Sequence, residues 1–317
     1  MSGPSISIII PNYNHAQYLQ RSVGALLCQS VLPSEIIVAD DASTDNSIEV
    51  LEGLAKQNSI VRICRNERNL GVNVSMNRAL TFARGDYVGF FPADDESRPG
   101  LIENVARMFR QYPNAGLCSG ISEWRCTATG LRWYNGGGMP KTHCYLTPNE
   151  MVKLSRRGRL AINNQNVVFR RSAFVEAGTW LPELKWFTDW FADCVIGFRH
   201  GMCHIPEVLA NFYLHPNSYY NSTAHAHAER RAVMAKILDH LESDKYADVA
   251  PLIRDSGFMG HFGWQMLRLV ASRPKRWQFL TPAFLRQAAK RSAEIVGRRY
   301  FPDWLAKFCL KTFYRRG

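Results

Sequence analysis

The sequence contains eight cysteines but no C-x-x-C pair. A zinc ribbon needs closely spaced thiol pairs, and a disulfide framework is typical of short, cysteine-dense secreted chains. Neither pattern is present in this chain of 317 residues. We therefore expect reduced and mostly buried thiols.

Long apolar runs are also absent. No run reaches the about 18 consecutive apolar residues that a membrane-spanning helix needs, and Met1-Ser2-Gly3-Pro4 leads into an apolar strand without a charged leader. We therefore expect the protein to be made and kept in the cytoplasm. The length and the ordinary apolar fraction of 46% exclude disordered and fibrous classes, and predict a large α/β domain with an appendage or two modest domains.

Acidic residues are scarce near the C-terminus. Between Arg273 and Gly317, twelve Lys and Arg residues stand against only Glu294 and Asp303, so most of the formal charge of +12 lies there. After Pro302, bulky apolar residues recur at helical spacing with basic residues off that face: Trp304, Leu305, Phe308, Cys309 and Phe313, with Lys307, Lys311, Arg315 and Arg316. Such a tail is typical of a helix lying on an anionic membrane surface. Docking on the main domain or on another protein remains an alternative. No nucleic-acid reader motif accompanies the charge, so we expect no nucleic-acid partner.

Short apolar runs alternate with helical periods over the first two thirds of the chain. This alternation predicts an α/β fold with a mostly parallel sheet flanked by helices. The expected strands cover residues 5–10, 35–38, 60–64, 85–91, 115–119, 166–169 and 205–214. Beyond His215 only helical patterns occur. We therefore place a main domain at residues 1–220 and a helical C-terminal region with a basic amphipathic tail at residues 221–317.

Local signals predict where several helices end. Gly85 is expected to stop a helix over residues 72–84, and Gly201 one that starts at Asp189. Thr147-Pro148-Asn149-Glu150 has the pattern of a capping box at a helix start. We expect residues 124–139 to be irregular.

Polar residues follow the first, second and fourth expected strands, and the fourth is followed by two adjacent aspartates, Asp94 and Asp95. The others are Asn12 with Asn14 after the first strand and Asp40 with Asp41 after the second. Because the carboxyl ends of parallel strands share one edge of a sheet, these groups are expected to meet in one crevice. A ligand site is favoured over coincidental turn chemistry, although Asp and Asn are ordinary turn and cap residues.

No glycine-rich phosphate loop follows any of these strands: neither G-x-x-x-x-G-K-[ST] nor G-x-G-x-x-G is present there. Carboxylates repel a diphosphate unless a divalent cation lies between them, and Mg²⁺ or Mn²⁺ binds one or two carboxylates together with phosphate oxygens. The pattern therefore favours metal-assisted departure of a phosphorylated leaving group.

These motifs, taken in order, resemble those of the family 2 glycosyltransferases of GT-A fold. The resemblance covers about residues 5 to 217 and rests on Ile8-Ile9-Ile10-Pro11-Asn12-Tyr13-Asn14, Asp40-Asp41-Ala42-Ser43-Thr44-Asp45, Asn69-Leu70-Gly71, Ala83-Arg84-Gly85-Asp86-Tyr87 and Pro92-Ala93-Asp94-Asp95. It implies a GT-A type, Rossmann-like catalytic domain that acts on a nucleotide-sugar.

The resemblance implies roles for individual residues. Asp40 matches the aspartate that hydrogen-bonds the nucleobase, usually uracil, and Pro11 and Tyr13 fall in the loop around the base. Asp94 and Asp95 match the carboxylates of the metal motif, in which Pro92 replaces the first aspartate. Met76 likewise stands where many relatives have arginine.

Further along the chain, the resemblance assigns the general base and another metal ligand. Thr188-Asp189 stands where the family has Glu-Asp, so Asp189 is the expected catalytic base; the alternative is that it only caps the following helix. His215 matches a histidine that reaches the metal in related enzymes, and a structural histidine is the alternative. The aromatic residues near Asp189 are expected either to form an acceptor-sugar platform or to belong to the core: Trp180, Trp186, Phe187, Trp190 and Phe191.

The sequence thus predicts an inverting, Mn²⁺- or Mg²⁺-assisted glycosyltransferase of the hexosyl- or N-acetylhexosaminyl-transferase class. Its expected donor is a nucleotide-sugar, first a UDP-sugar, and its acceptor a hydroxyl of a glycan or a polyprenyl-linked glycan. We expect it at the cytoplasmic face of the plasma membrane, in polysaccharide biosynthesis. A non-catalytic protein that binds a nucleotide-sugar or a partner is the alternative, since Pro92 and Thr188 depart from the family pattern.

Overall fold

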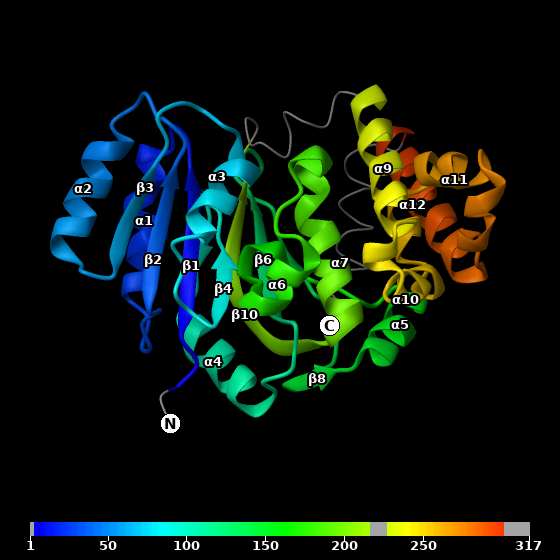
Figure 1. The fold of residues 1–317 in the computed structure, drawn as a ribbon, viewed down its shortest axis with the longest axis horizontal. Coiled ribbons are helices and arrows are strands. Elements are labelled where there is room, and N and C mark those ends of the chain that lie inside the picture. Colours follow the sequence, from blue (N-terminus) through cyan, green and yellow to red (C-terminus); the bar gives the residue numbers. More distant parts are fainter. Residues whose placement is uncertain (1–2, 216–226, 301–317) are drawn as a thin grey trace.

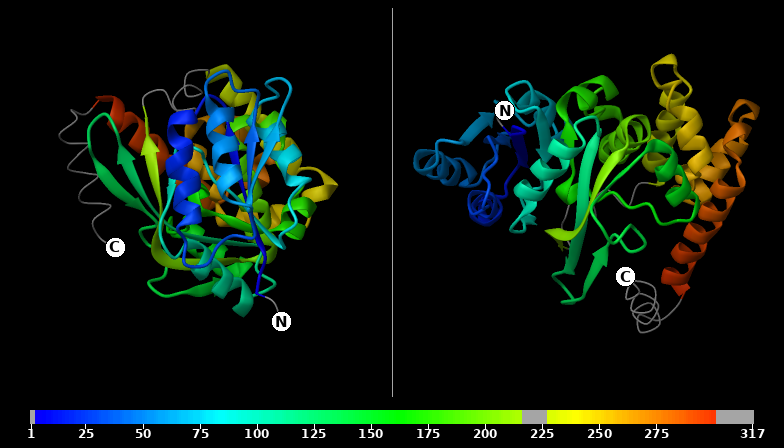
Figure 2. Two further views of the ribbon diagram at one scale, coloured as in Figure 1. Left: turned by 90° about the vertical axis from the view of Figure 1, so that its left-hand side faces the viewer. Right: turned by 90° about the horizontal axis from the view of Figure 1, so that it is seen from below.

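The computed structural model describes residues 3–215 and 227–300. The tail after Pro302 and the domain boundary that the sequence places near Tyr220 lie outside these residues. Figures 1 and 2 show a mixed sheet between two layers of helices, with further helices at one end.

Ten strands form one sheet in the described part of the chain, in the spatial order β3-β2-β1-β4-β9-β6-β10-β5, with β7 beside β6 and β8 beside β10. β1 pairs in parallel with β2 and β4, β2 with β3, and β6 with β10, whereas the short β9 is antiparallel to both neighbours. Six strands, β1, β2, β3, β4, β6 and β10, therefore run in one direction, and their carboxyl ends share an edge. The strands are β1 (Ile6–Asn12), β2 (Glu35–Asp40), β3 (Val61–Arg65), β4 (Tyr87–Phe90), β5 (Glu96–Ser97), β6 (Leu117–Cys126), β7 (Arg132–Asn135), β8 (Cys144–Leu146), β9 (Val168–Arg170) and β10 (Met202–Leu214).

Helices cover both faces of the sheet, as the alternation of strand and helix patterns predicts. Side chains of α1, α2 and α4 pack on one face, and those of α3, α6 and α7 on the other. The α-helices are α1 (Ala16–Leu27), α2 (Ser47–Gln57), α3 (Val72–Leu80), α4 (Leu101–Gln111), α5 (Pro148–Arg156), α6 (Arg171–Ala177), α7 (Thr188–His200), α9 (His227–Leu241), α10 (Ala250–Ser256), α11 (Trp264–Ala271) and α12 (Pro282–Tyr300). Short 3-10 helices connect them: η1 (Asn164–Asn166), η2 (Pro182–Phe187), η4 (Asp244–Tyr246), η5 (Phe258–Phe262) and η6 (Pro274–Phe279).

Two sequence predictions of local structure are wrong. The third helix ends at Leu80, and Gly85 serves a close approach of two segments: a Cβ there would lie 2.7 Å from the Ser7 backbone nitrogen. The region expected to be irregular contains the last residues of β6 and all of β7. These two strands pair from Ser122↔Asn135 to Arg125↔Arg132. The capping box is confirmed: the Thr147 hydroxyl accepts from the Glu150 N–H, and the Glu150 carboxylate accepts from the Thr147 N–H.

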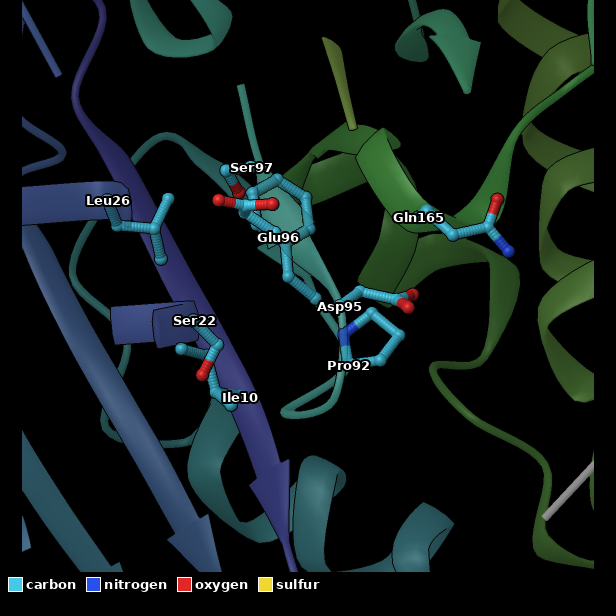
Figure 3. Close-up of a pocket in the computed structure, with 9 residues that line it drawn as sticks. Ile10, Ser22, Leu26, Pro92, Asp95, Glu96, Ser97 and Gln165 are labelled. Carbon is cyan, nitrogen blue, oxygen red and sulfur yellow. The ribbon is translucent and has the colours of Figure 1, made fainter. Parts of the chain in front are cut away.

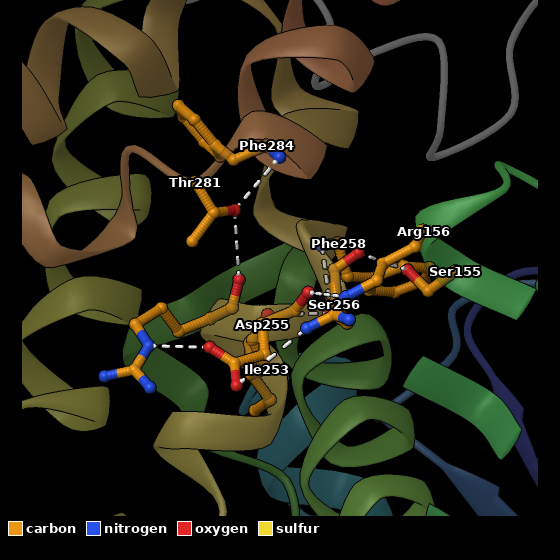
Figure 4. Close-up of polar contacts among 9 residues, drawn as sticks. Ser155, Arg156, Ile253, Asp255, Ser256, Phe258, Thr281 and Phe284 are labelled. Atoms are coloured by element: carbon orange, nitrogen blue, oxygen red, sulfur yellow. Dashed lines mark hydrogen bonds and ion pairs between the residues drawn. The ribbon is translucent and has the colours of Figure 1, made fainter. Parts of the chain in front are cut away.

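The C-terminal helices dock on the main domain through α5 and α7. The Ser155 hydroxyl donates to the Ser256 carbonyl at 3.1 Å, and Arg156 donates to the Asp255 carbonyl at 2.7 Å (Figure 4). One hydrophobic cluster extends from Ile9 and Ile37 of the sheet to Ile237 of α9 and Phe284 of α12. The two predicted regions thus share a core.

Two predictions from what the sequence lacks can be compared with the structure. All seven described cysteines are free, and four of them are buried, as expected: Cys64, Cys118, Cys194 and Cys203. Among the described helices, none is long and apolar enough to cross a membrane.

Candidate active site

The carboxyl ends of the parallel strands bring together the polar groups singled out in the sequence. Asn12 at the end of β1 lies in register with Asp40 at the end of β2, and Asp94 follows β4 on the other side of β1. Helix α1 connects this edge to the end of β10, because Arg21 donates to the Asp94 carbonyl and the Tyr18 ring lies 5.4 Å from the ring of His215. The predicted convergence is therefore present.

On the side predicted to bind the nucleotide, Asp40 is fully buried. Its Oδ1 accepts from Asn12 Nδ2 at 2.8 Å and from the Ser43 hydroxyl at 2.5 Å, and its Oδ2 accepts from the Ser43 N–H. The carboxylate thereby fixes the loop between β2 and α2. Tyr13 is 45% exposed beside it and Pro11 is half-buried, so these two offer the accessible surface for a base. Contact between Asp40 and a base stays a prediction.

The second aspartate of that pair fixes another loop, a role that sequence reasoning missed. Asp41 accepts hydrogen bonds from Asn66 Nδ2 and from the N–H groups of Leu70 and Gly71, each at 2.8 Å. These three hydrogen bonds hold the segment around Leu70 and Gly71 against the end of β2. The only sequence signal was the adjacency of two aspartates at a strand end.

In the predicted metal motif, Asp94 is half-buried and Asp95 is buried. Asp95 Oδ1 accepts from the Tyr213 N–H at 3.0 Å, and Oδ2 is buried with no hydrogen bond from any described residue. Burial, and then the charge of Asp94, raise the pKa of Asp95 well above its usual range. Asp95 also lines a cavity of about 10 Å³ with Pro92 and Gln165 (Figure 3). Such a volume holds about one water molecule, so this cavity is too small for a substrate.

These two carboxylates fit a divalent cation in their chemistry. Hard oxygen ligands are what Mg²⁺ and Mn²⁺ prefer, and a cation would neutralise a pair whose mutual repulsion already disfavours ionisation. Within residues 3–215 and 227–300, however, no three His, Cys, Asp or Glu side chains gather as a metal-holding group. The predicted set of Asp94, Asp95 and His215 is therefore not assembled, and diphosphate oxygens would have to complete the shell.

His215 contacts a hydroxyl group and two tyrosine rings. Its Nδ1 lies 3.3 Å from the Thr127 hydroxyl, and its ring packs between those of Tyr18 and Tyr213. The imidazole is thus held as part of an aromatic group at the end of β10. A role for His215 toward a metal stays a prediction.

The predicted base, Asp189, lies in the first turn of α7 and is half-buried. Its Oδ2 accepts from Asn164 Nδ2 at 2.5 Å, and its Oδ1 accepts from the Trp190 N–H at 2.6 Å. Desolvation by its surroundings raises the pKa of Asp189, and the hydrogen bond from Asn164 partly offsets this effect. The helix starts one residue earlier than predicted, with Phe187 at the N-cap, so Asp189 is not the cap residue.

Helix η1 lies between the predicted base and the predicted metal motif. Asn164 holds Asp189, while the next residue, Gln165, lines the cavity beside Asp95. Asn166 anchors η1 by accepting from the Gly120 N–H at 2.8 Å and donating to the Ser122 hydroxyl. Sequence reasoning missed this element and expected a strand from Asn166, which begins at Val168. The run of amide residues at positions 163–166 was the available signal.

The aromatic residues near Asp189 mostly belong to the core. Trp180 is buried against Phe90 and Phe174, and the Trp190 ring stacks on Phe258 of η5 with centroids 5.5 Å apart. The sequence left open an acceptor-sugar platform or a place in the core for this group, and Trp180 and Trp190 pack in the core.

Comparison with known proteins identifies the family. The profile of the family described as "Glycosyl transferase family 2" matches residues 7–173, which is more than half of the chain. The chain belongs to this family. Its fold is the mixed α/β GT-A fold, as the sequence motifs predicted.

Two family relatives are named for polysaccharide synthesis. Chondroitin synthase of Pasteurella multocida is 40% identical over 106 residues, which are 33% of this chain and 11% of the relative. The teichuronic acid biosynthesis glycosyltransferase TuaG of Bacillus subtilis is 35% identical over 119 residues, 38% of this chain and 47% of the relative. The chain therefore spans less than half the length of either relative.

Solved structures of TarS from S. aureus resemble the fold. The complex of TarS residues 1–349 with UDP-GlcNAc superposes with a TM-score of 0.62 over 92% of this chain and 81% of TarS, at 16% identity. The complex with UDP gives a TM-score of 0.62 over 86% of this chain and 77% of TarS, at 18% identity. At this identity the likeness concerns the fold alone.

Proposed function

We propose that this protein is an inverting glycosyltransferase of the hexosyl- or N-acetylhexosaminyl-transferase class. It transfers a sugar from a nucleotide-sugar, first a UDP-sugar, to a hydroxyl of a glycan or lipid-linked acceptor. The observation that carries the proposal is the placement of Asp189: Asn164 holds its carboxylate at 2.5 Å, and the next residue of η1 lies beside Asp95. The residue proposed as the base and the two aspartates proposed to hold the metal thus flank one short element.

In this reaction the acceptor oxygen attacks the anomeric carbon while Asp189 takes the hydroxyl proton. The bond from that carbon to the diphosphate oxygen breaks, and the nucleoside diphosphate leaves with the bonding electron pair. Because entry and departure occur on opposite faces of the sugar, the anomeric configuration inverts. Asp94 and Asp95 would hold a Mg²⁺ or Mn²⁺ ion, which supplies charge neutralisation for the diphosphate.

The choice of donor and acceptor has separate support. Solved TarS structures, which share the fold, contain UDP and UDP-GlcNAc, and exposed Tyr13 lies beside the loop that Asp40 fixes. Relatives named for chondroitin and teichuronic acid synthesis support a polysaccharide acceptor.

A second candidate function is nucleotide-sugar binding without turnover. Two observations favour it: Pro92 occupies the first position of the metal motif, and no three metal-binding groups gather in the described part of the chain. This candidate predicts donor binding that persists while no product forms.

The test compares Asp189→Asn with Asp94→Ala in the full chain. A thermal-shift screen with UDP-, dTDP- and GDP-sugars, with and without Mn²⁺, identifies the donor, because a ligand raises the apparent stability of the native state. With that donor, slow hydrolysis or transfer is measured by release of the nucleoside diphosphate. Asp189→Asn should keep the thermal shift and lower turnover about 10²- to 10⁴-fold, whereas Asp94→Ala should weaken the Mn²⁺-dependent part of the shift.

The matched control is Glu52→Gln on the exposed side of α2, which removes a carboxylate away from the site. It should match the wild type in both assays. Donor binding without turnover in the wild type would favour the second candidate, and unchanged turnover in Asp189→Asn would refute the assigned base.

A further inference from the structure

Helix α11 carries an exposed face that includes two tryptophans. Trp264, Arg268 and Ala271 recur at i, i+4 and i+7 and are all exposed, so they lie on one side of the helix. The Trp277 indole N–H donates to the Ala271 carbonyl at 3.1 Å, which places a second ring at the end of α11. We call these four residues the tryptophan face. Helix α11 lies at the end of the molecule opposite α2 (Figure 1).

The two rings are unusually accessible. Trp264 is 53% exposed and Trp277 is 56% exposed. Large aromatic side chains usually bury most of their 150–250 Å² of surface, and tryptophan is enriched where an apolar environment meets water. Two such rings at the ends of an eight-residue helix, about 12 Å long by its rise per residue, suit a flat interfacial partner.

Basic residues predominate in the segment that carries the face. Residues 256–293 contain seven Lys and Arg residues and no Asp or Glu. The Arg268 guanidinium lies 5.1 Å from the Trp264 ring centre, and exposed Lys290 lies on the neighbouring helix α12. Neither forms an ion pair with a described acidic residue.

Acidic groups on α9 and α12 are already engaged, and Glu294 of α12 pairs with Arg291 at 3.3 Å. Asp239 and Glu242 pair with the buried guanidinium of Arg276, and also lie within 4 Å of Arg273 and Lys275, at 3.8 and 3.9 Å. They therefore neutralise η6 and leave Arg268 uncompensated on the tryptophan face.

We propose that the tryptophan face binds the surface of an anionic phospholipid bilayer, with both indole rings at the level of the headgroups and Arg268 near lipid phosphates. Exposed aromatic area combined with uncompensated cations is what an interfacial site needs. A second copy of the chain fits less well, because a two-fold contact would bring the same basic face against itself.

The proposal does not rest on the proposed reaction, since binding to vesicles requires neither donor nor acceptor. It also differs from the prediction for the tail after Pro302, which lies outside the described residues. A substitution in the tryptophan face of the full chain leaves that tail intact. The experiment therefore separates membrane binding by the face from membrane binding by the tail.

The experiment measures co-sedimentation of the full chain with vesicles of phosphatidylcholine plus phosphatidylglycerol, and with vesicles of phosphatidylcholine alone. Wild type should bind the anionic vesicles, and the double variant Trp264→Ala with Trp277→Ala should bind them at least about tenfold more weakly, because two rings no longer leave water. Arg268→Gln should weaken binding less and make it less sensitive to salt. The control is Tyr134→Ala on β7, a side chain 51% exposed outside the face, and it should bind like the wild type.

Circular dichroism confirms that each variant is folded, and Trp264→Phe with Trp277→Phe should restore part of the binding. Equal binding by the double alanine variant and the wild type would overturn the proposal. So would equal binding of the wild type to neutral vesicles. A self-association of the wild type that the alanine variant abolishes, without any vesicle binding, would assign the face to a second copy instead.

Discussion

The surroundings of Asp189 raise the pKa of its carboxyl group. Desolvation raises the pKa of Asp189, and the neighbouring carboxyl of Asp193, one helical turn later, has its own pKa raised well above the usual range by burial and by the charge of Asp189. A base must be ionised to take a proton, so turnover should fall as pH falls through the pKa of Asp189. We therefore expect the acid limb of kcat against pH at a higher pH than an ordinary aspartate gives.

Asn164 offers a direct test of that assignment. Its amide stabilises the ionised form of Asp189 through the 2.5 Å hydrogen bond, so Asn164→Ala should raise the pKa of Asp189 and move the acid limb to higher pH. The plateau turnover should also fall, because the carboxylate loses the partner that orients it. If Asn164 were only structural, Asn164→Ala would lower the plateau of kcat and leave the acid limb at the same pH. That result would contradict the assignment of Asp189 as the base.

At the scale of elements, the contact between η5 and α12 fixes the C-terminal helices. A Cβ on Gly260 would lie 2.6 Å from the Phe284 carbonyl oxygen and 2.7 Å from the Gln287 Cβ. Neither α12 backbone nor a tightly held side chain can yield at low cost, so Gly260→Ala should lower the free energy of unfolding by about 1–3 kcal/mol. Urea denaturation followed by circular dichroism measures the change.

The matched control for this change is Gly53→Ala. Gly53 lies in the interior of α2, and no atom lies within 4 Å of a Cβ built there. Alanine should therefore stabilise the helix by about 0.5–1 kcal/mol, since it has less conformational freedom to lose than glycine. Equal effects of the two substitutions would show that α12 does not pack on η5 as described.

The features that could be predicted from sequence are those that depend on neighbouring residues or on strand direction. The capping box at Thr147 follows from four consecutive residues, and the meeting of Asn12 with Asp40 follows from the parallel direction of two strands. The β6–β7 hairpin could not be predicted, because its exposed strand β7 carries no apolar alternation and pairs only through tertiary structure. Gly85 was misread for a related reason: the nearby backbone of Ser7, 78 residues earlier, explains the glycine better than a helix end does.

In the candidate site, too, residues could be predicted from local motifs and their tertiary contacts could not. Asp94, Asp95 and Asp189 were identified from motifs, but the contacts that define their chemistry were not. Asn164 meets Asp189 only because η1 folds against α7, and no local pattern specifies that contact. His215 could be placed at the end of β10, whereas its packing between Tyr18 and Tyr213 depends on how α1 crosses the sheet.

At the scale of the whole molecule, the C-terminal helices complete the hydrophobic core of the main domain. Trp190 of α7 stacks on Phe258, and Phe191 packs edge-on against Tyr246, whose hydroxyl donates to the Ala177 carbonyl at 2.9 Å. The face of α7 opposite the sheet is therefore covered by residues that follow position 227. The segment that carries Asp189 depends on those helices for its burial.

This arrangement predicts that the two regions unfold together. For the full chain we expect one transition in urea, with coincident curves from tryptophan fluorescence and far-ultraviolet circular dichroism, as a two-state unit gives. A chain cut after residue 215 would expose Phe191 and Trp190, each of which buries about 150–250 Å² when packed, and should be insoluble or should melt well below the full chain. Two separate transitions, or a soluble 1–215 fragment with the melting temperature of the full chain, would show instead that the helices are an independent appendage. In that case Gly260→Ala should leave the main transition unchanged, so the two experiments check each other.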